Sequence, residues 1–359
     1  MTNFVCTKDY EQKALNLLTP NVRDFYKGGS GEEITLKWNR DAFGRIRILP
    51  RMLRDVRKVD LSTTILGEKV SMPLGISPTA LQRMAHPDGE CANAKAAEAA
   101  GIIYTLSTLS SSSIEEVAQA APKCIKWFQL YIFPDRKLTL DLVRRAEKSG
   151  FKALVVTVDS PTAGNRRNEL RNNFKKPSHI IFANLKNYSL QNSFSNDPYS
   201  LRLDLSLSWE DISWLKKNTC LPIVTKGILT AEDALLSIKH GASGILISNH
   251  GGRQTDGVPA TIEVLPEIVK AVGEKVEIYI DGGFSQGSDV FKALALGAKM
   301  ALFGRPMLWA LACEGEKGAK NILETMRREI FLTFTLTGCR NVQEVSKTMV
   351  CHESRFSHF

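Results

Sequence analysis

The segment ISNHGGRQTDG, residues 247–257, ends an apolar run with several groups that can do chemistry. His250 can accept or donate a proton near neutral pH, because the pKa of imidazole lies in that range. Arg253 can bind an anion through two parallel N–H donors. The glycines and Asp256 would equally suit an ordinary polar turn. The segment is therefore either a turn or part of an active site, and the elements around it must decide.

Eight short apolar runs alternate with helical patterns along the middle of the chain. Nearly continuous apolar strands are typical of a parallel sheet that is covered on both faces. Eight strand–helix units within about 250 residues predict a (β/α)8 TIM barrel, of class α/β. An open doubly wound sheet is the alternative, because the number of strands alone does not require closure. The runs are Met72–Ala80, Ile102–Thr108, Ile125–Ile132, Ala153–Asp159, Leu221–Gly227, Gly244–His250, Glu277–Gly283 and Met300–Pro306.

The rest of the chain is expected to complete one domain of residues 1–359. Residues 1–71 are predicted to form a helical extension that packs on the barrel of residues 72–312, and residues 313–359 a helical segment and tail. Residues 160–207 are rich in Asn, Ser and Lys and follow the fourth strand. So long a polar connection predicts a lid or mobile loop on the carboxyl face of the barrel, where such enzymes keep their active sites.

Composition narrows the possible partners. The chain has 43% hydrophobic and 24% charged residues, as in an ordinary soluble enzyme. Seven scattered cysteines form no CxxC pair, which argues against a zinc site or a disulfide framework. No apolar run reaches the roughly 20 residues of a membrane helix. The net charge of +9 is spread along the chain rather than clustered. We therefore expect no metal, no membrane and no nucleic acid as partner.

Polar residues follow every predicted strand, and the carboxyl ends of barrel strands share one face. A full ring of hydrogen-bonding groups at one mouth is hard to explain as turns alone, so it favours an active site. Glycines after the seventh and eighth strands are common phosphate sites, with Arg305 as a charged clamp. The strand ends are Pro78-Thr79-Ala80, Ser107-Thr108, Gln129-Leu130-Tyr131, Thr157-Val158-Asp159, Lys226-Gly227, Ser248-Asn249-His250, Asp281-Gly282-Gly283 and Gly304-Arg305.

These residues belong to longer motifs that resemble one family over nearly the whole chain. The motifs are PTALQRMAHPDGE, WFQLY, TVDSP, GNRR, LPIVTKG, SNHGGRQTDGVPATI, DGG, FKALALGA, GRP and LTGCRNVQEV. They resemble the FMN-dependent 2-hydroxy acid oxidases, the glycolate oxidase family. The resemblance implies a flavin-binding TIM barrel that oxidises an (S)-2-hydroxy acid to a 2-oxo acid, with O2 reduced to hydrogen peroxide. A dehydrogenase that uses another electron acceptor, or a weakened non-catalytic flavoprotein, is the alternative.

The resemblance also implies roles for individual residues. His250 matches the catalytic base, Asp159 the carboxylate that orients it, and Lys226 the cation beside the flavin. Arg253 and Arg166 match the pair that binds the substrate carboxylate. Tyr131 matches a residue whose hydroxyl donates to the substrate. The residues that match the positions in contact with FMN are Pro78, Thr79, Ala80, Ser107, Gln129, Thr157, Lys226, Ser248, Asp281, Gly282, Gly283, Gly304 and Arg305.

Three positions depart from the short-chain glycolate oxidases. Phe25 stands where they have a tyrosine, whose hydroxyl helps to hold the substrate carboxylate. Leu109 stands where they have a tryptophan, which enlarges the pocket. Both changes resemble the long-chain 2-hydroxy acid oxidase branch, so we expect a medium- or long-chain substrate. Ser285 replaces an arginine of the family's phosphate site, so we expect weaker binding of FMN.

Localisation and assembly are expected from the family as well. The terminal Ser357-His358-Phe359 is similar to a peroxisomal import tripeptide, with Phe in place of Leu. Peroxisomal import is therefore expected, with the cytoplasm as the alternative. A homotetramer is expected by analogy with the family.

Overall fold

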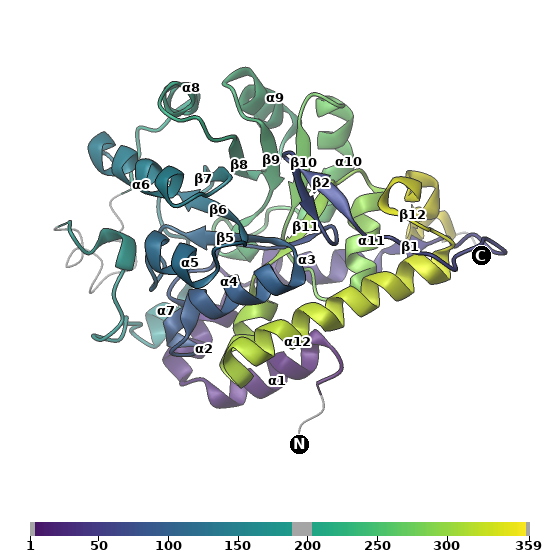
Figure 1. Ribbon diagram of the computed structural model, residues 1–359, viewed down its shortest axis with the longest axis horizontal. Helices are drawn as coiled ribbons and strands as arrows, with labels where there is room; N and C mark the ends of the chain where they lie inside the picture. Colours follow the sequence, from purple (N-terminus) through teal and green to yellow (C-terminus); the bar gives the residue numbers. More distant parts are fainter. Residues whose placement is uncertain (1–3, 189–202, 357–359) are drawn as a thin grey trace.

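The computed structural model describes residues 4–188 and 203–356, and at its centre eight parallel strands form a closed barrel (Figure 1). Closure is made by pairing between the last and the first strand, with Ala301 opposite Leu74 and Phe303 opposite Ile76. The predicted (β/α)8 barrel is thereby confirmed, and the open doubly wound sheet is excluded. In chain order the strands are β4 (Leu74–Ile76), β5 (Ile103–Ser107), β6 (Ile125–Leu130), β7 (Ala153–Thr157), β8 (Ile223–Ile228), β9 (Gly244–Ile247), β10 (Glu277–Ile280) and β11 (Met300–Phe303).

Helices surround the barrel and cover the outer face of its strands (Figure 1). Several begin at a residue whose side chain accepts a backbone N–H of the first turn, such as Ser113, Asp135 and Thr230. The surrounding helices are α4 (Gly89–Ala100), α5 (Ile114–Ala120), α6 (Arg136–Lys148), α8 (Trp209–Lys217), α9 (Ala231–Lys239), α10 (Thr261–Val272), α11 (Gly287–Ala295) and α12 (Arg305–Thr337), the last of which is broken at Glu314 and Gly315.

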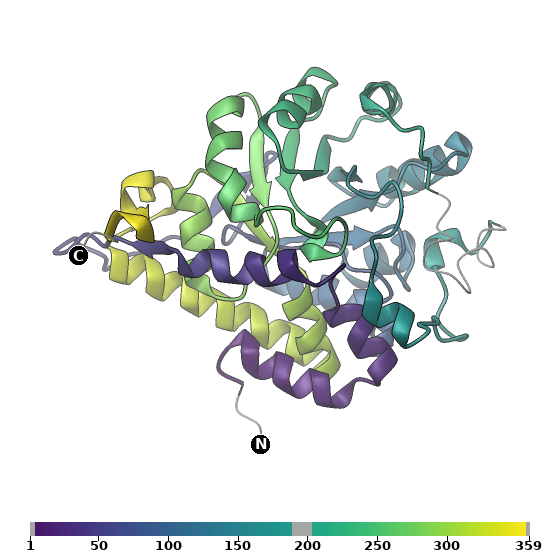
Figure 2. The ribbon, with the colours of Figure 1, turned by 180° about the vertical axis from the view of Figure 1, so that it is seen from behind.

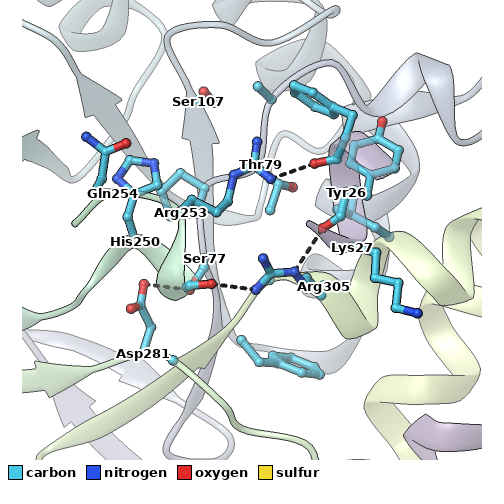
Figure 3. Close-up of a pocket in the computed structure, with 18 of the residues that line it drawn as sticks. Tyr26, Lys27, Ser77, Thr79, Ser107, His250, Arg253, Gln254, Asp281 and Arg305 are labelled. Atoms are coloured by element: carbon cyan, nitrogen blue, oxygen red, sulfur yellow. Dashed lines mark hydrogen bonds between the residues drawn. The ribbon is translucent and has the colours of Figure 1, made fainter. Parts of the chain in front are cut away.

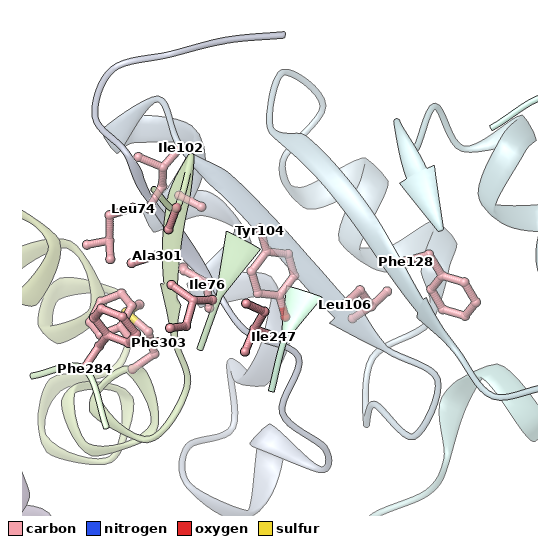
Figure 4. Close-up of a cluster of buried hydrophobic side chains, with 14 of the residues drawn as sticks. Leu74, Ile76, Ile102, Tyr104, Leu106, Phe128, Ile247, Phe284, Ala301 and Phe303 are labelled. Carbon is pink, nitrogen blue, oxygen red and sulfur yellow. The ribbon is translucent and has the colours of Figure 1, made fainter. Parts of the chain in front are cut away.

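Alternation along the strands divides the core into two layers. In β11, Met300 and Leu302 belong to the cluster inside the barrel, with Trp127 and Tyr279. Their neighbours in the strand belong to the layer between strands and helices, which Figure 4 shows with side chains from β4, β5, β6, β9 and β11. Because both faces of each strand are buried, the strands read as continuous apolar runs.

A hairpin closes the amino-terminal end of the barrel. Its strands β2 (Thr63–Ile65) and β3 (Glu68–Val70) place Ile65 and Val70 in the inner cluster. The backbone N–H of Leu66 at its turn donates to the carboxylate of Glu277, at the start of β10. The hairpin leaves the opposite end of the barrel, at the carboxyl ends of the strands, for the candidate active site.

The two ends of the chain pack together beside the barrel. Helix α1 (Thr7–Leu17) lies along α12, as both views show (Figures 1 and 2). Strand β1 (Ile46–Ile48) pairs antiparallel with β12 (Val350–His352). Helices α2 (Pro20–Lys27) and α3 (Ile34–Gly44) reach the carboxyl end of the barrel, where the Tyr26 hydroxyl donates to the carbonyl of Leu81.

The segment after β7 is described in part. It contains α7 (Arg167–Arg171) and the 3-10 turn η2 (Ala183–Leu185). Residues 189–202, in the second half of the predicted lid, lie outside the described residues. Short 3-10 turns are also found at η1 (Gln82–Met84), η5 (His250–Gly252), η6 (Val342–Glu344), η7 (Lys347–Met349) and η8 (Glu353–Phe356).

None of the helices in the described part of the chain is long and apolar enough to cross a membrane.

Candidate active site

The carboxyl ends of the strands open into a cavity of about 470 Å3. Every residue that the sequence predicted for the site lines this cavity, except Asp159 and Ser248. Those two lie behind His250 and bind it: Asp159 through the ring, and Ser248 through its hydroxyl, which accepts the backbone N–H of His250 at 3.1 Å. Figure 3 shows His250, Gln254 and Asp281 on one side of the cavity, with Arg305, Tyr26 and Lys27 on the other.

His250 and Asp159 form a hydrogen-bonded pair. The Nδ1 atom of His250 lies 3.0 Å from Oδ1 of Asp159, and the hydroxyl of Ser160 contacts both side chains. The backbone of His250 has a φ of 57°, which is uncommon for a residue other than glycine. Since Nδ1 donates its proton to the carboxylate, Nε2 is left as the proton acceptor.

The electrostatics of this pair favour a neutral imidazole. Burial lowers the pKa of His250 below its ordinary value near 6.5, and the charge of Lys226 lowers this pKa further, while Asp159 acts in the opposite direction. Burial by itself would raise the pKa of Asp159, but the charges of His250 and Lys226 and hydrogen bonds from His250 and Ser160 lower it overall. At neutral pH the pair is therefore a neutral imidazole beside a carboxylate.

A glycine allows Asp159 to come this close to β8. Gly227 has a φ of +114°, and a Cβ placed there would lie 2.6 Å from the Cβ of Asp159. The preceding residue, Lys226, is 3% exposed and lines the cavity. Among the described residues, none forms a hydrogen bond with the ammonium of Lys226. Its charge is therefore available to a bound molecule.

The two predicted carboxylate-binding arginines meet at a third, acidic residue. Arg253 donates from Nη2 to Oε1 of Glu169 at 3.1 Å, and Nη1 of Arg166 lies 3.8 Å from the same oxygen. Arg253 also donates to the backbone carbonyls of Phe25 and Gly28. The side chain of Glu169 is 1% exposed, so this buried carboxylate holds both guanidinium groups in place.

An apolar wall faces these arginines. The ring of Phe25 stacks on that of Phe174, with centroids 4.6 Å apart. The guanidinium of Arg253 lies over the ring of Phe25, 5.1 Å from its centroid. Phe182 and Leu109 line the cavity as well. Phe25, which lacks the hydroxyl of the tyrosine in short-chain glycolate oxidases, is thus held by ring stacking and a cation–π contact.

A network of polar side chains joins three strand ends. The amide oxygen of Gln129 accepts hydrogen bonds from the Ser107 hydroxyl and the backbone N–H of Thr108, both at 3.1 Å. The amide nitrogen of Gln129 donates to the hydroxyl of Thr157 at 3.0 Å. The ends of β5, β6 and β7 are therefore held in one fixed arrangement.

Nearby, burial raises the pKa of Tyr131 to about 12, so its hydroxyl stays protonated and can donate.

The far end of the cavity lies at the turns after β10 and β11. The Ser77 hydroxyl donates to Oδ2 of Asp281 at 3.2 Å. Arg305 donates to three backbone carbonyls, those of Tyr26, Gly251 and Gly28. Burial, followed by repulsion from Arg253, lowers the pKa of Arg305 to about 9. An anion bound here would relieve that burial cost.

Several residues that support the site were not predicted from the sequence. Ser160 and Gln254 belong to the motifs TVDSP and SNHGGRQ, so their positions were available as a signal. The amide of Gln254 donates to the backbone carbonyl of Asp159 at 2.9 Å and accepts from Arg166. Glu169 carried no signal, because it stands in a charged stretch that is typical of an exposed surface.

The fold and this site define a flavin-dependent barrel enzyme, and the chain belongs to the FMN-dependent dehydrogenase family, whose model matches residues 14–352. It is 49% identical to 2-hydroxyacid oxidase 1 of Homo sapiens, over 98% of this chain and 97% of that protein. It is 48% identical to glycolate oxidase of Spinacia oleracea, over 95% and 94% of the two chains. A solved mandelate oxidase with (S)-4-hydroxymandelic acid is 42% identical, with a TM-score of 0.90, over 95% of this chain and 97% of that one.

These findings confirm the family that the motifs predicted. The protein is an FMN-dependent oxidoreductase of the 2-hydroxy acid oxidase family, and FMN is its cofactor.

The residues of the cavity fit this cofactor. Among the described residues, Oδ1 of Asp281 is buried without a hydrogen-bond partner, so it can accept a hydroxyl of the ribityl chain. Lys226 supplies a buried cation that forms no hydrogen bond with a described residue, and Arg305 is a partly buried cation that an anion would stabilise. The cavity thus offers groups for a hydroxyl-bearing chain and for negative charge at two separate places.

Proposed function

We propose that the protein oxidises medium- or long-chain (S)-2-hydroxy acids to 2-oxo acids and uses O2 as the final electron acceptor. The observation that carries this proposal is the His250–Asp159 pair, which faces the same cavity as Arg253 and an apolar wall. A proton acceptor, a carboxylate-binding cation and apolar surface are the three things that such a substrate requires.

His250 takes a proton from the substrate as its CH–OH group becomes a carbonyl. The neutral imidazole accepts the proton at Nε2, and the carboxylate of Asp159 stabilises the imidazolium that results. Asp159 also fixes the orientation of the ring, with Ser160 and Ser248 as further supports. When bound, FMN would accept the two electrons and the second hydrogen that the substrate loses, and O2 would take up both electrons and two protons to become hydrogen peroxide.

Arg253 and Arg166 bind the substrate carboxylate, and Tyr131 donates its hydroxyl to the substrate. Both arginines are already oriented by Glu169, so little side-chain freedom is lost on binding. Tyr131 stays protonated near neutral pH and can donate, because its pKa is raised to about 12. The substrate is thereby held with C2 within reach of His250.

The remaining predicted residues hold the cofactor. Lys226 would stabilise negative charge on the flavin ring system. Gln129, Ser107 and Thr157 present their network to the same ring system, together with Pro78, Thr79 and Ala80. Asp281 would bind the ribityl chain, and the backbone of Gly282, Gly283 and Gly304 at the turns after β10 and β11 would hold the phosphate together with Arg305.

Phe25 and Leu109 set the preference for a larger substrate. Neither offers a polar group to the cavity, and together with Phe174 and Phe182 they form an apolar surface. Glycolate has no side chain to bury against it. The mandelate oxidase relative, solved with (S)-4-hydroxymandelic acid, supports a family pocket of this kind that accepts a bulky side chain.

Steady-state kinetics test this proposal. Purified protein is assayed for hydrogen peroxide with 2-hydroxyoctanoate and with glycolate, each as the (S)-acid where a stereocentre exists. We expect the higher kcat/KM with 2-hydroxyoctanoate. A higher kcat/KM with glycolate would contradict the substrate class, and turnover that requires an artificial acceptor instead of O2 would point to the dehydrogenase alternative.

Location and assembly complete the proposal. The protein enters the peroxisome, where the hydrogen peroxide can be removed, although Ser357-His358-Phe359 lies outside the described residues. A tagged chain with a free carboxyl terminus that stays diffuse in the cytosol would contradict this. The homotetramer, by analogy with the family, predicts four times the chain mass of 39.8 kDa in light scattering.

A further inference from the structure

At position 285, near the phosphate end of the cavity, the resembling enzymes have an arginine and this chain has the uncharged Ser285. The backbone N–H of Ser285 donates to Oδ2 of Asp289 at 3.0 Å, and its carbonyl accepts the hydroxyl of Thr7 at 2.7 Å. The loop after β10 is therefore well ordered by its own contacts, but residue 285 adds no positive charge. Another residue must supply the charge if the phosphate is to be held as firmly.

Helix α3 brings Arg40 to this end of the cavity. A Cβ at Gly283 would lie 2.0 Å from the backbone oxygen of Asn39, so α3 is packed directly on the glycine turn. From there, Arg40 donates through Nη1 to the carbonyl of Gly283 and to Oδ2 of Asp289, at 2.5 and 2.7 Å. The side chain lines the cavity and is 40% exposed.

The guanidinium of Arg40 keeps donors free for an anion. Within the described part of the chain, both of its hydrogen bonds use Nη1, which leaves Nε and Nη2. Arg305 keeps fewer, because its Nε, Nη1 and Nη2 each already donate to a backbone carbonyl, which leaves one N–H on each Nη atom. The carboxylate of Asp289 is shared among several donors, since it also accepts the backbone N–H groups of Ser285 and Gln286 before α11.

We propose that Arg40 binds the phosphate of FMN and supplies the charge that Ser285 lacks. Asp289 and the carbonyl of Gly283 orient its guanidinium, so that two donors can face one phosphate oxygen pair. The inference rests on the phosphate position proposed above, at the turns after β10 and β11. A purely structural role, in which Arg40 only ties α3 to the β10 turn, is the competing explanation.

A comparison of FMN with riboflavin, which lacks the phosphate, separates the two roles. Full-length protein loaded with either flavin is diluted, and the fluorescence of released flavin gives the dissociation constant. Arg40→Met is expected to weaken FMN about tenfold, as for one charge-assisted hydrogen bond, and to change riboflavin less than about twofold. Adding Ser285→Arg to Arg40→Met should restore most of the FMN affinity.

Two further variants serve as controls. Arg45→Met removes a partly exposed arginine at the end of the same helix, paired with Glu263, and should leave both dissociation constants unchanged. Lys27→Met removes the exposed lysine that Figure 3 shows beyond Arg305. If Lys27→Met weakens FMN selectively and Arg40→Met does not, the inference is overturned.

Equal weakening of FMN and riboflavin by Arg40→Met would show the structural role and overturn the inference, as would no weakening. Arg305→Met tests the phosphate position separately. If Arg305→Met and Arg40→Met both leave the ratio of the FMN and riboflavin dissociation constants unchanged, the proposed phosphate position is wrong. If Arg305→Met changes this ratio and Arg40→Met does not, only the role of Arg40 fails. Should Arg40→Met not fold, Arg40→Lys decides, with a selective loss of FMN of about threefold expected and an unchanged ratio as the contradicting result.

Discussion

The Nδ1 atom of His250 lies 3.0 Å from Oδ1 of Asp159, although 91 residues separate the two in the chain. Each stands just after a barrel strand, Asp159 after β7 and His250 after β9, with β8 between them. The contact crosses β8 at Gly227, where no side chain intervenes. The proton acceptor of the proposed reaction is thus built from three adjacent strand ends.

Replacement of His250 should remove proton transfer and leave the cofactor site intact. We expect His250→Gln to retain FMN, because other residues of the cavity hold the cofactor. We expect the same variant to lower kcat by at least about 10²-fold. Flavin content and steady-state turnover are measured on the same preparation. Turnover near that of the unmodified protein would remove His250 from the mechanism.

The pH dependence should follow the lowered pKa of His250. Only the neutral imidazole accepts a proton, so kcat/KM should fall as the pH decreases through this pKa, which lies below 6.5. In Asp159→Asn the charge that raises the pKa of His250 is gone. The acid limb should therefore move to still lower pH, while kcat falls at least about tenfold. An acid limb above pH 6.5 in the unmodified protein, or one that Asp159→Asn leaves in place, would speak against this assignment.

Gly227 should be needed for the position of Asp159. In Gly227→Ala the new methyl group would lie 2.6 Å from the Cβ of Asp159, in a backbone with a φ of +114°. We expect a loss of about 1–3 kcal/mol in the free energy of unfolding and a fall in kcat of at least about tenfold. Gly150→Ala is the matched control, because Gly150 also has a positive φ but has nothing within 4 Å of a Cβ. Its stability should fall by about 1 kcal/mol and its kcat should not change.

Substrate preference should reverse with two substitutions in the apolar wall. Each methylene buried there contributes about 0.8 kcal/mol, so a few methylenes offset a lost hydrogen bond of about 1 kcal/mol. Phe25→Tyr with Leu109→Trp restores a hydroxyl and fills the space, so kcat/KM should rise for glycolate relative to 2-hydroxyoctanoate. The ratio of the two kcat/KM values measures this. An unchanged ratio would place the determinants of chain length elsewhere.

Much of the fold was predictable, because burial on both faces makes the barrel strands continuous apolar runs. All the barrel strands except β8 end earlier than the predicted runs: β4 stops at Ile76, whereas the run continues to Ala80. Those last residues leave the ladder to face the cavity. The hairpin of β2 and β3 was not predicted, since three-residue strands with exposed positions carry little periodic signal.

The candidate site was predictable only where a residue type signals its chemistry. His250 and Arg253 were recognisable from their types and motif, and the structure brings them to one cavity. Glu169 and Arg40 were not, because a charged residue in a helix is usually solvated. Their places depend on long-range packing, of α7 against Arg253 and of α3 against Gly283, which local sequence does not encode.

The most direct test of the central claim is the flavin absorbance during one complete cycle. The protein is mixed with 2-hydroxyoctanoate without oxygen, and O2 is then admitted while the 2-oxo acid and hydrogen peroxide are quantified. We predict that the flavin absorbance bleaches on mixing and returns with O2, and that each 2-oxo acid formed is matched by one hydrogen peroxide. Flavin that no 2-hydroxy acid bleaches would contradict the proposed enzyme, and bleached flavin that O2 does not restore would contradict its identity as an oxidase.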